Sequence, residues 1–248
     1  GNVIARITDD AKIEAYNNVL VNSDAKTVNM VGSGALGIGM DTGAGAVAIS
    51  TALEYGETSA YIEDANVKAY GKGSNMTVDS GDLASAGSLP DLSTSGQGED
   101  DGDDSNADAV DMDDLTTGFD LLSLAKGTQS ASGLVVNATS RTKQQAIVVG
   151  GAGGKSVAIN ANVATNVTFN DTKAYIENAT INNNISGENG ADVLVRSGAH
   201  EAGLAVSAGI AISGGGEGAA AGVAGFATNS QKRSSTATID NSDVNANE

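Results

Sequence analysis

The stretch Glu57-Thr-Ser-Ala-Tyr-Ile-Glu-Asp-Ala65 decides the fold, because it returns later in the chain as Asp171-Thr-Lys-Ala-Tyr-Ile-Glu-Asn-Ala179. Weaker copies of the same motif lie at residues 5–11 and 237–242. A motif that recurs at intervals of tens of residues is the signature of a repeat architecture, in which each unit is covered by its neighbours. The sequence therefore predicts a stack of similar units.

The spacing of the motif measures the unit. With Ala5, Ala60, Ala174 and Ala237 as anchors, the successive differences in residue number are 55, 114 and 63. The segment 81–133 is distinct in composition, and removing its 53 positions from the middle interval leaves 114 − 53 = 61. One unit is therefore roughly 60 residues long, the order of length that repeat architectures show. With strands of roughly five residues, we expect about three rungs of roughly 20 residues in each unit.

The same spacing predicts the size of the stack. Outside the distinct segment, 248 − 53 = 195 positions remain, enough for near ten rungs. At about 4.8 Å per rung, these would make a rod of about 45 to 50 Å.

The composition and the residue pattern favour strands over helices. The chain has 33 glycines, no tryptophan and 3% aromatic residues, so the bulky side chains of an ordinary globular core are scarce. Tracts at 34–40, 45–50, 155–163 and 203–213 alternate small or polar residues with branched apolar ones. This period of two is typical of strands, and small side chains are buried when successive turns of chain stack. We predict an all-β fold, a β-solenoid.

Recurring polar residues predict ladders along this stack. Tyr61 and Tyr175 occupy the same motif position, so we expect their rings to stack at the sheet surface or in the core. Asparagines at Asn178 and at 182–184 fall where the chain should turn. Because Asn tolerates left-handed backbone and can hydrogen-bond to its copies, we predict a structural role for them.

An acidic insertion divides the repeats into 1–80 and 134–248. Residues 81–133 contain the only proline, Pro90, and the stretch from Glu99 to Asp114 carries nine acids without a basic residue. Like charges at this density repel and favour an extended, solvated loop. Leucine and phenylalanine spacing over Leu115–Leu124 predicts a short helix in the same insertion.

The aspartate run is the candidate metal site. Calcium takes six to eight oxygen ligands from carboxylates and amides in flexible loops, which makes calcium the ion to consider. The run lacks the Asp-x-Asp-x-Asp-Gly order and distal Glu of an EF-hand, so a solvated loop with diffuse cation attraction is the favoured interpretation, with no cofactor required. The candidate ligands are Asp100, Asp101, Asp103, Asp104, Asn106 and Asp108.

Charge and hydropathy restrict the partners. The formal net charge is −18, which argues against nucleic acid and anionic membrane surfaces as partners. There is no cysteine, no leader of basic then apolar residues and no run of 18 apolar residues. We therefore expect no signal peptide and no membrane span within this segment, and because its ends cut into repeats we expect it to be an excerpt of a longer chain.

Three other patterns admit a chemical interpretation. The GxGxxG at 32–37 and the Gly-Lys-Ser at 154–156 resemble nucleotide-binding loops, but glycine-rich or alternating residues follow where a helix is required, so close strand packing explains them better. His200, with Arg196 and Glu201, would be the acid and base cluster of a carbohydrate-active enzyme. A surface strand end is the favoured interpretation of these three residues.

The motif copies, the Val/Leu-rich strands that accompany them and the Gly-Ala-Gly-Gly-Lys-Ser-Val-Ala-Ile tract from Gly151 to Ile159 together resemble the giant filamentous adhesins of Gram-negative bacteria, of the leukotoxin-type and filamentous-haemagglutinin-like kind. The resemblance covers nearly all of the chain outside the insertion. It implies a right-handed parallel β-helix, exported through an outer-membrane partner and displayed at the cell surface. It supplies no catalytic motif.

We therefore expect a non-enzymatic structural and adhesive segment of a secreted bacterial surface filament, a repetitive rod that spaces or presents binding regions. Its expected partners are host or neighbouring-cell surface proteins or glycans, with end-to-end self-association. The alternatives are a self-assembling extracellular fibre or surface-layer subunit, and a carbohydrate-active β-helix enzyme. A trimeric autotransporter head is a further alternative, but its repeat units are far shorter than the spacing of this motif.

Overall fold

The structure is a computed structural model that describes residues 1–40, 43–83, 126–183, 185, 192–214 and 219–246. All regular structure in these ranges is β-strand, as predicted, and no helix there is long and apolar enough to cross a membrane. The strands are β1 (Asn2–Ile7), β2 (Lys12–Ala15), β3 (Val19–Gly39), β4 (Gly43–Glu63), β5 (Asn66–Ala69), β6 (Met76–Leu83), β7 (Lys126–Ala131), β8 (Leu134–Gly154), β9 (Val157–Glu177), β10 (Thr180–Ile181), β11 (Val193–Ser213), β12 (Ala220–Asp240) and β13 (Asp243–Val244).

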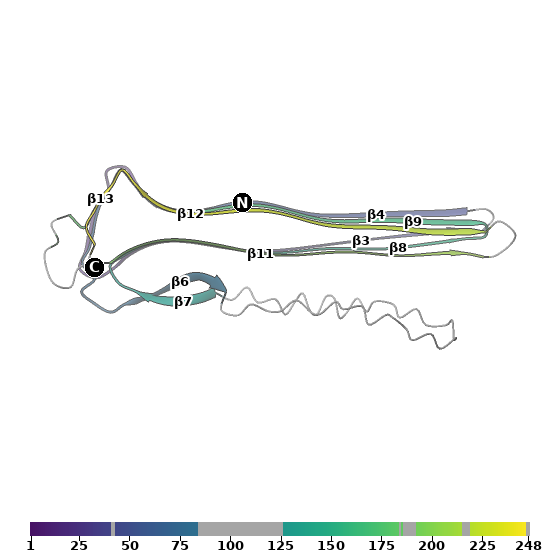
Figure 1. Ribbon diagram of the computed structural model, residues 1–248, viewed down its shortest axis with the longest axis horizontal. Coiled ribbons are helices and arrows are strands. Elements are labelled where there is room, and N and C mark those ends of the chain that lie inside the picture. Colours follow the sequence, from purple (N-terminus) through teal and green to yellow (C-terminus); the bar gives the residue numbers. More distant parts are fainter. Residues whose placement is uncertain (41–42, 84–125, 184, 186–191, 215–218, 247–248) are drawn as a thin grey trace.

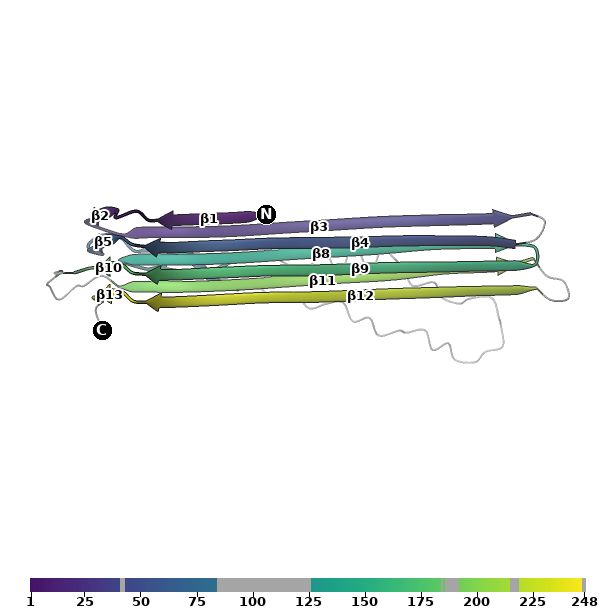
Figure 2. The ribbon, with the colours of Figure 1, turned by 90° about the horizontal axis from the view of Figure 1, so that it is seen from above.

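Two long parallel sheets form a thin slab. One sheet has the strand order β1-β4-β9-β12 and the other the order β11-β8-β3, and a short parallel sheet, β13-β10-β5-β2, lies beside them. Figure 1 shows the two long sheets as facing layers, with the short strands at one end of the slab. Seen from above in Figure 2, the strands of successive turns lie side by side. This all-parallel arrangement is consistent with a β-solenoid.

The motif copies stack in a single register. Ala5 pairs with Ala60, Ala60 with Ala174, and Ala174 with Ala237. The predicted role of the motif as a marker of position in the repeat is therefore confirmed. Each copy lies at the end of its long strand, immediately before the chain turns into the short sheet.

The predicted division of each unit into three rungs is wrong. One unit forms a single turn of chain, made of two long strands and one short strand, as in β8, β9 and β10. There are three such turns in the described residues, beginning with β3, β8 and β11 and preceded by β1 and β2. The stack is therefore about 14 Å high at about 4.8 Å per strand, whereas each long strand is about 70 Å long at about 3.3 Å per residue.

The apolar core lies at the end of the slab that carries the short strands. Ile62 and Ile176 from the motif are fully buried there against Val67, Leu134 and Ile181. Because side chains alternate along a strand, the tyrosines and glutamates of the motif lie on the opposite, outer face. The alanines and isoleucines of the motif thus form part of the apolar core.

The predicted tyrosine stacking occurs on the outer face and one asparagine pair joins successive turns at a corner, whereas Asn184 lies outside the described residues. The Tyr61 and Tyr175 rings stack with centroids 4.6 Å apart and planes within 4°. Asn178 and Asn182 have φ angles of 50° and 55°, the left-handed region that Asn tolerates. The Asn241 side-chain amide donates to the Oδ1 of Asn178 at 2.6 Å, so the corner residues of successive turns are joined.

Toward the other end of the slab the interior changes from apolar to small and polar. Most of the buried residues there are alanines and asparagines, including Asn160, Asn162 and Asn166, and Val148 is the largest apolar side chain among them. The strands approach so closely that a Cβ atom on Gly37 would lie 2.3 Å from the carbonyl oxygen of Gly45. Only glycine fits at such a contact, and the thin interior has no room for large side chains.

The insertion begins and ends as an antiparallel hairpin of β6 and β7. Strand β6 starts at Met76, ahead of the expected boundary at residue 81. Figure 1 shows the hairpin beside the layer that contains β11. The helix predicted over Leu115–Leu124 lies outside the described residues.

Candidate functional site: an anchored insertion, a polar cleft and two apolar faces

The predicted calcium ligands lie outside the described residues, so calcium binding stays a prediction. They are Asp100, Asp101, Asp103, Asp104, Asn106 and Asp108. Within the ranges that the structure describes, no three His, Asp or Glu side chains are grouped to hold a metal ion.

The three residues considered for carbohydrate chemistry do not form one cluster. Arg196 and His200 lie on the outer face of β11, where Arg196 donates to the Oε1 of Gln129 at 2.6 Å and His200 Nε2 lies 2.5 Å from the carbonyl oxygen of Gly81. Glu201 alternates with them and faces the interior, where the Asn170 amide donates to its Oε1 at 3.1 Å. The acid and the two bases are therefore on opposite faces of one sheet.

The nucleotide-binding patterns are part of the strands. Residues 32–37 lie inside β3, and the glycines at 150, 151, 153 and 154 end β8. Strand β9 follows this second run from Val157, in the place of the helix that a phosphate-binding loop requires. A Cβ atom on Gly154 would lie 2.2 Å from the carbonyl oxygen of Val157, which explains the glycine by close packing.

A buried ion pair anchors the insertion to the slab. Arg141, on the outer face of β8, donates through Nη1 to Asp79 Oδ2 on β6 at 2.5 Å and through Nη2 to Asp24 on β3. The side chains of Arg141 and Asp79 are only 4% and 2% exposed. The Thr139 hydroxyl contacts both carboxylates, at 3.1 Å from Asp24 and 3.3 Å from Asp79. One guanidinium therefore joins the hairpin to two neighbouring turns of the stack.

The anchor has one weaker, solvent-exposed contact and one further buried hydrogen bond. Lys126 of β7 lies 3.3 Å from Asp24, but its side chain is half exposed, so solvent screens the pair. The Gly81 amide donates to Asp79 Oδ1 at 2.9 Å within β6. The sequence carries no local signal of this site, because Asp24, Asp79 and Arg141 come together only through the strand register.

Burial is the main cause of the raised pKa values of two groups in the long sheets, Glu201 and Tyr175. Burial raises the pKa of Glu201 above its ordinary value, although the Asn170 hydrogen bond and nearby Arg233 act in the opposite direction. Burial also raises the pKa of Tyr175 to about 12, and the neighbouring Tyr61 and acidic side chains add to the shift. Both groups therefore favour their protonated forms in the folded chain.

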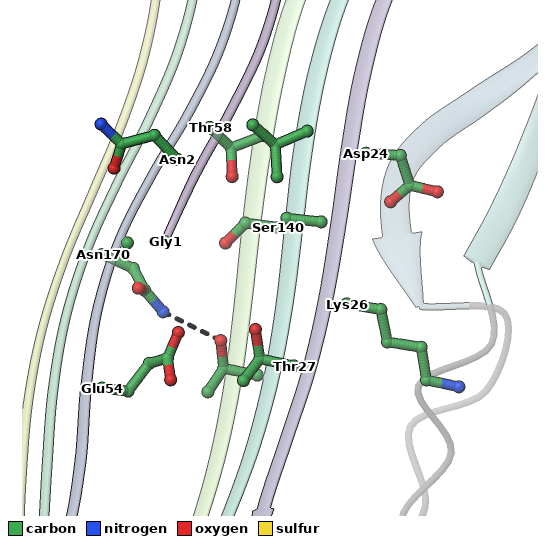
Figure 3. Close-up of a pocket in the computed structure, with 13 residues that line it drawn as sticks. Gly1, Asn2, Asp24, Lys26, Thr27, Glu54, Thr58, Ser140 and Asn170 are labelled. Carbon is green, nitrogen blue, oxygen red and sulfur yellow. Dashed lines mark hydrogen bonds between the residues drawn. The ribbon is translucent and has the colours of Figure 1, made fainter.

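A polar cleft of about 340 Å³ opens between the long sheets at the edge formed by β1, β3 and β4. Figure 3 shows Thr27, Glu54 and Asn170 directed toward the space between the sheets, with Asp24 and Lys26 on the other side of β3. The Asn170 amide donates to the Thr142 hydroxyl at 2.9 Å, and the buried Ser140 hydroxyl has no hydrogen-bond partner among the described residues. The cleft offers hydroxyl, amide and carboxylate groups to a small polar ligand.

The outer faces of the two long sheets are apolar at the end of the slab away from the short strands. Large apolar side chains alternate with the small interior ones, and the outer faces therefore carry most of the valine, leucine, isoleucine and methionine of this region. On the β3-β8-β11 sheet they border a groove of about 670 Å³ with a glycine floor. The exposed ones include Met30, Leu36, Ile38, Val47, Ile49, Leu53, Val149, Ile159, Ile210, Ile212 and Phe226.

Comparisons with protein families, curated proteins and solved structures find no match for this chain.

Proposed function

We propose that this chain is a non-enzymatic structural and adhesive segment of a secreted bacterial surface filament. In this proposal a right-handed parallel β-solenoid acts as a repetitive scaffold that spaces or presents regions binding a host or neighbouring-cell protein or glycan. The observation that carries the proposal is the single register of the stacked motif, in which Ala5, Ala60, Ala174 and Ala237 lie in one column. Turns that stack in one register extend without changing the turns already present, which suits a spacer.

The acidic insertion adds a second argument. Its hairpin is held on the outer face of the slab by Arg141, so the two strands that border residues 84–125 lie at a defined place on the stack. Loops that a rigid scaffold positions are common carriers of binding function. We infer that the repeats supply the scaffold and that the insertion distinguishes this segment from its neighbours.

Adhesion is tested by coating beads with the purified chain and measuring their retention under flow on host cells and on immobilised glycans. A matched variant replaces residues 84–125 with a short Gly-Ser linker and keeps β6 and β7. We expect the chain to hold beads and the variant to release them if the insertion carries the binding. Beads that detach as quickly as bare beads from every surface would refute the adhesive role, and a crystal structure with left-handed turns would refute the handedness.

A self-assembling fibre is the second candidate, and the ends of the stack favour it. In the described part of the chain, β3 presents an unpaired edge at one end of the stack, and β11 and β12 present unpaired edges at the other. Exposed edges of such long strands are templates for pairing with another chain. Filaments that grow along the stacking direction in electron micrographs of the purified chain would favour the fibre over a rod that stays monomeric.

The carbohydrate-enzyme alternative gains nothing from the placement of its residues, because Glu201 faces away from Arg196 and His200. Incubating the chain with uronic-acid polymers and measuring chain cleavage tests it directly. Turnover that His200→Ala abolishes would overturn the non-enzymatic proposal.

A further inference from the structure

The outer face of the β3-β8-β11 sheet carries a groove near the turns that join the long strands. Gly151 and Gly153 of the central strand β8 form its floor. Leu36 and Ile38 of β3 pair with these glycines on one side, and isoleucines 210 and 212 of β11 pair with them on the other. The four wall side chains are 65 to 75% exposed, so nothing in the described chain covers the groove.

The outer face of the β4-β9-β12 sheet has the opposite relief at the same end. Val157 and Ile159 of its central strand β9 form a ridge, and Ile159 is 58% exposed. Their partners on β4 are Gly43 and Gly45, and those on β12 are Ala220 and Gly222. A ridge therefore stands between two troughs on this face, where the other face has a groove between two ridges.

We propose that the two faces are complementary and that a second copy of this chain packs on the first, with the β4-β9-β12 face of one against the β3-β8-β11 face of the other. The Val157 and Ile159 ridge enters the glycine groove, while the two walls of the groove enter the flanking troughs. Both faces have the same strand spacing of about 4.8 Å, so this ridge lies over this groove when the copies are related by translation across the slab.

The position of the relief along the strands agrees with this packing. Gly154 lies directly opposite Val157 across the turn, because a Cβ atom there would be 2.2 Å from the Val157 carbonyl oxygen. Gly153 and Ile159 consequently lie at nearly the same distance from the turn. A copy translated by the thickness of the slab brings the ridge over the groove without sliding along the strand axis.

The chemistry of the two faces also suits a second copy. Apart from Gln145, the outward positions of 30–38, 145–153 and 204–212 are glycine or apolar residues. Over nine residues and three strands, the apolar part of the β3-β8-β11 face is about 30 Å by 14 Å, on the order of 400 Å² per copy, which is about half of the about 800 Å² of a standard interface. Because the contact joins different faces, it leaves a free face on each copy and generates an open lateral array.

This inference does not depend on adhesion or on end-to-end growth, and cysteine cross-linking tests it separately. The chain has no cysteine. We would mix the single variants Gly153→Cys and Ile159→Cys, oxidise the mixture with copper phenanthroline, and measure dimers on non-reducing gels. Each molecule in the mixture carries one cysteine, so a disulfide can form only between copies. The two positions lie on opposite outer faces of the chain, so this disulfide requires contact between different faces.

The expected result is a disulfide dimer in the mixture and at most traces with either variant alone. A mixture of Ile159→Cys with Thr236→Cys, whose exposed threonine lies on the outer face beyond the apolar region, is the matched control. Equal dimer in this control, or no dimer in the Gly153→Cys mixture, would overturn the proposal.

Sedimentation of the full chain supplies an independent measurement. A Cβ atom on Gly153 meets nothing within 4 Å, so Gly153→Ile fits the chain while filling the groove. We expect its self-association to be weaker than that of the original chain by at least about tenfold, as for a change at the centre of an interface. Thr236→Ile should leave association unchanged. An original chain that stays monomeric up to about 1 mM would refute the inference.

Discussion

The buried ion pair between Arg141 and Asp79 holds the hairpin on the slab. Replacing Arg141 by Met keeps much of the side-chain volume but removes the positive charge that faces Asp79, whose side chain is 2% exposed. Asp79 would retain the Gly81 amide and the Thr139 hydroxyl as donors. Removing one partner of a buried ion pair costs about 3 to 5 kcal/mol, because the remaining charge is left desolvated. The docked hairpin should lose about that much free energy.

Hydrogen exchange measures this loss locally. A cost of about 3 to 5 kcal/mol raises the equilibrium for local opening by about two to three and a half powers of ten. We expect amide exchange in β6 and β7 to accelerate by that factor in Arg141→Met, while β9 serves as the internal reference. Lys126→Met removes only a half-exposed partner of Asp24 and should cost under about 1 kcal/mol.

A double variant separates charge burial from simple loss of contact. Arg141→Met combined with Asp79→Leu leaves no buried charge between hairpin and slab, so it should recover much of the lost protection. The reasoning would be refuted if Arg141→Met changed exchange in β6 and β7 by less than about fivefold, a difference of roughly 1 kcal/mol. Equal effects of Arg141→Met and Lys126→Met would contradict it as well.

Three further predictions concern the slab itself. Ile176→Ala, at a fully buried site, should lower the free energy of unfolding in urea by about 2 to 5 kcal/mol, whereas Ile239→Ala at a position 49% exposed should cost clearly less. Because the pKa of Glu201 is raised in the folded chain, its contribution to stability is fully present at low pH and is lost as pH rises through the folded pKa. In parallel denaturant titrations, the stability of Glu201→Gln relative to the original chain should therefore be higher at pH 7 than at pH 4. Absorbance titration of the tyrosines should show one phenol titrating near pH 12 that Tyr175→Phe removes, and stability should fall as pH rises from 10 towards 12.

The local rules of the sequence predicted the strands but not their length. Alternation and stacking follow from residue types, and the recurrence of the motif at 57–65 and 171–179 predicted the register. The predicted strand length is wrong because it rests on the common strand length of roughly five residues. From Val19 to Gly39 the alternation continues through the glycines without a proline or an Asn-Gly turn, and this continuity was the available signal.

The site was less predictable for a physical reason. Asp79 and Arg141 are 62 residues apart, and their contact depends on how the hairpin lies on the slab. Neither residue has a neighbour in sequence that marks it as buried. The opposite orientation of His200 and Glu201, by contrast, follows from strand alternation alone once residues 193–213 are recognised as one continuous strand.

The small interior and the apolar exterior of the slab have the same cause. Where Gly37 and Gly45 approach too closely for any side chain between them, the interior accepts only glycine, alanine and short polar residues. Each such residue is followed along the strand by one that must point outward, and at these positions the chain carries Leu36, Ile38 and Ile159. No repacking within one copy can bury these side chains, because the inner face has no volume for them. Contact between the outer faces of different molecules is then the route by which this end of the slab removes its apolar surface from water, which is why the groove and the ridge, rather than the interior, are where we expect partners to act.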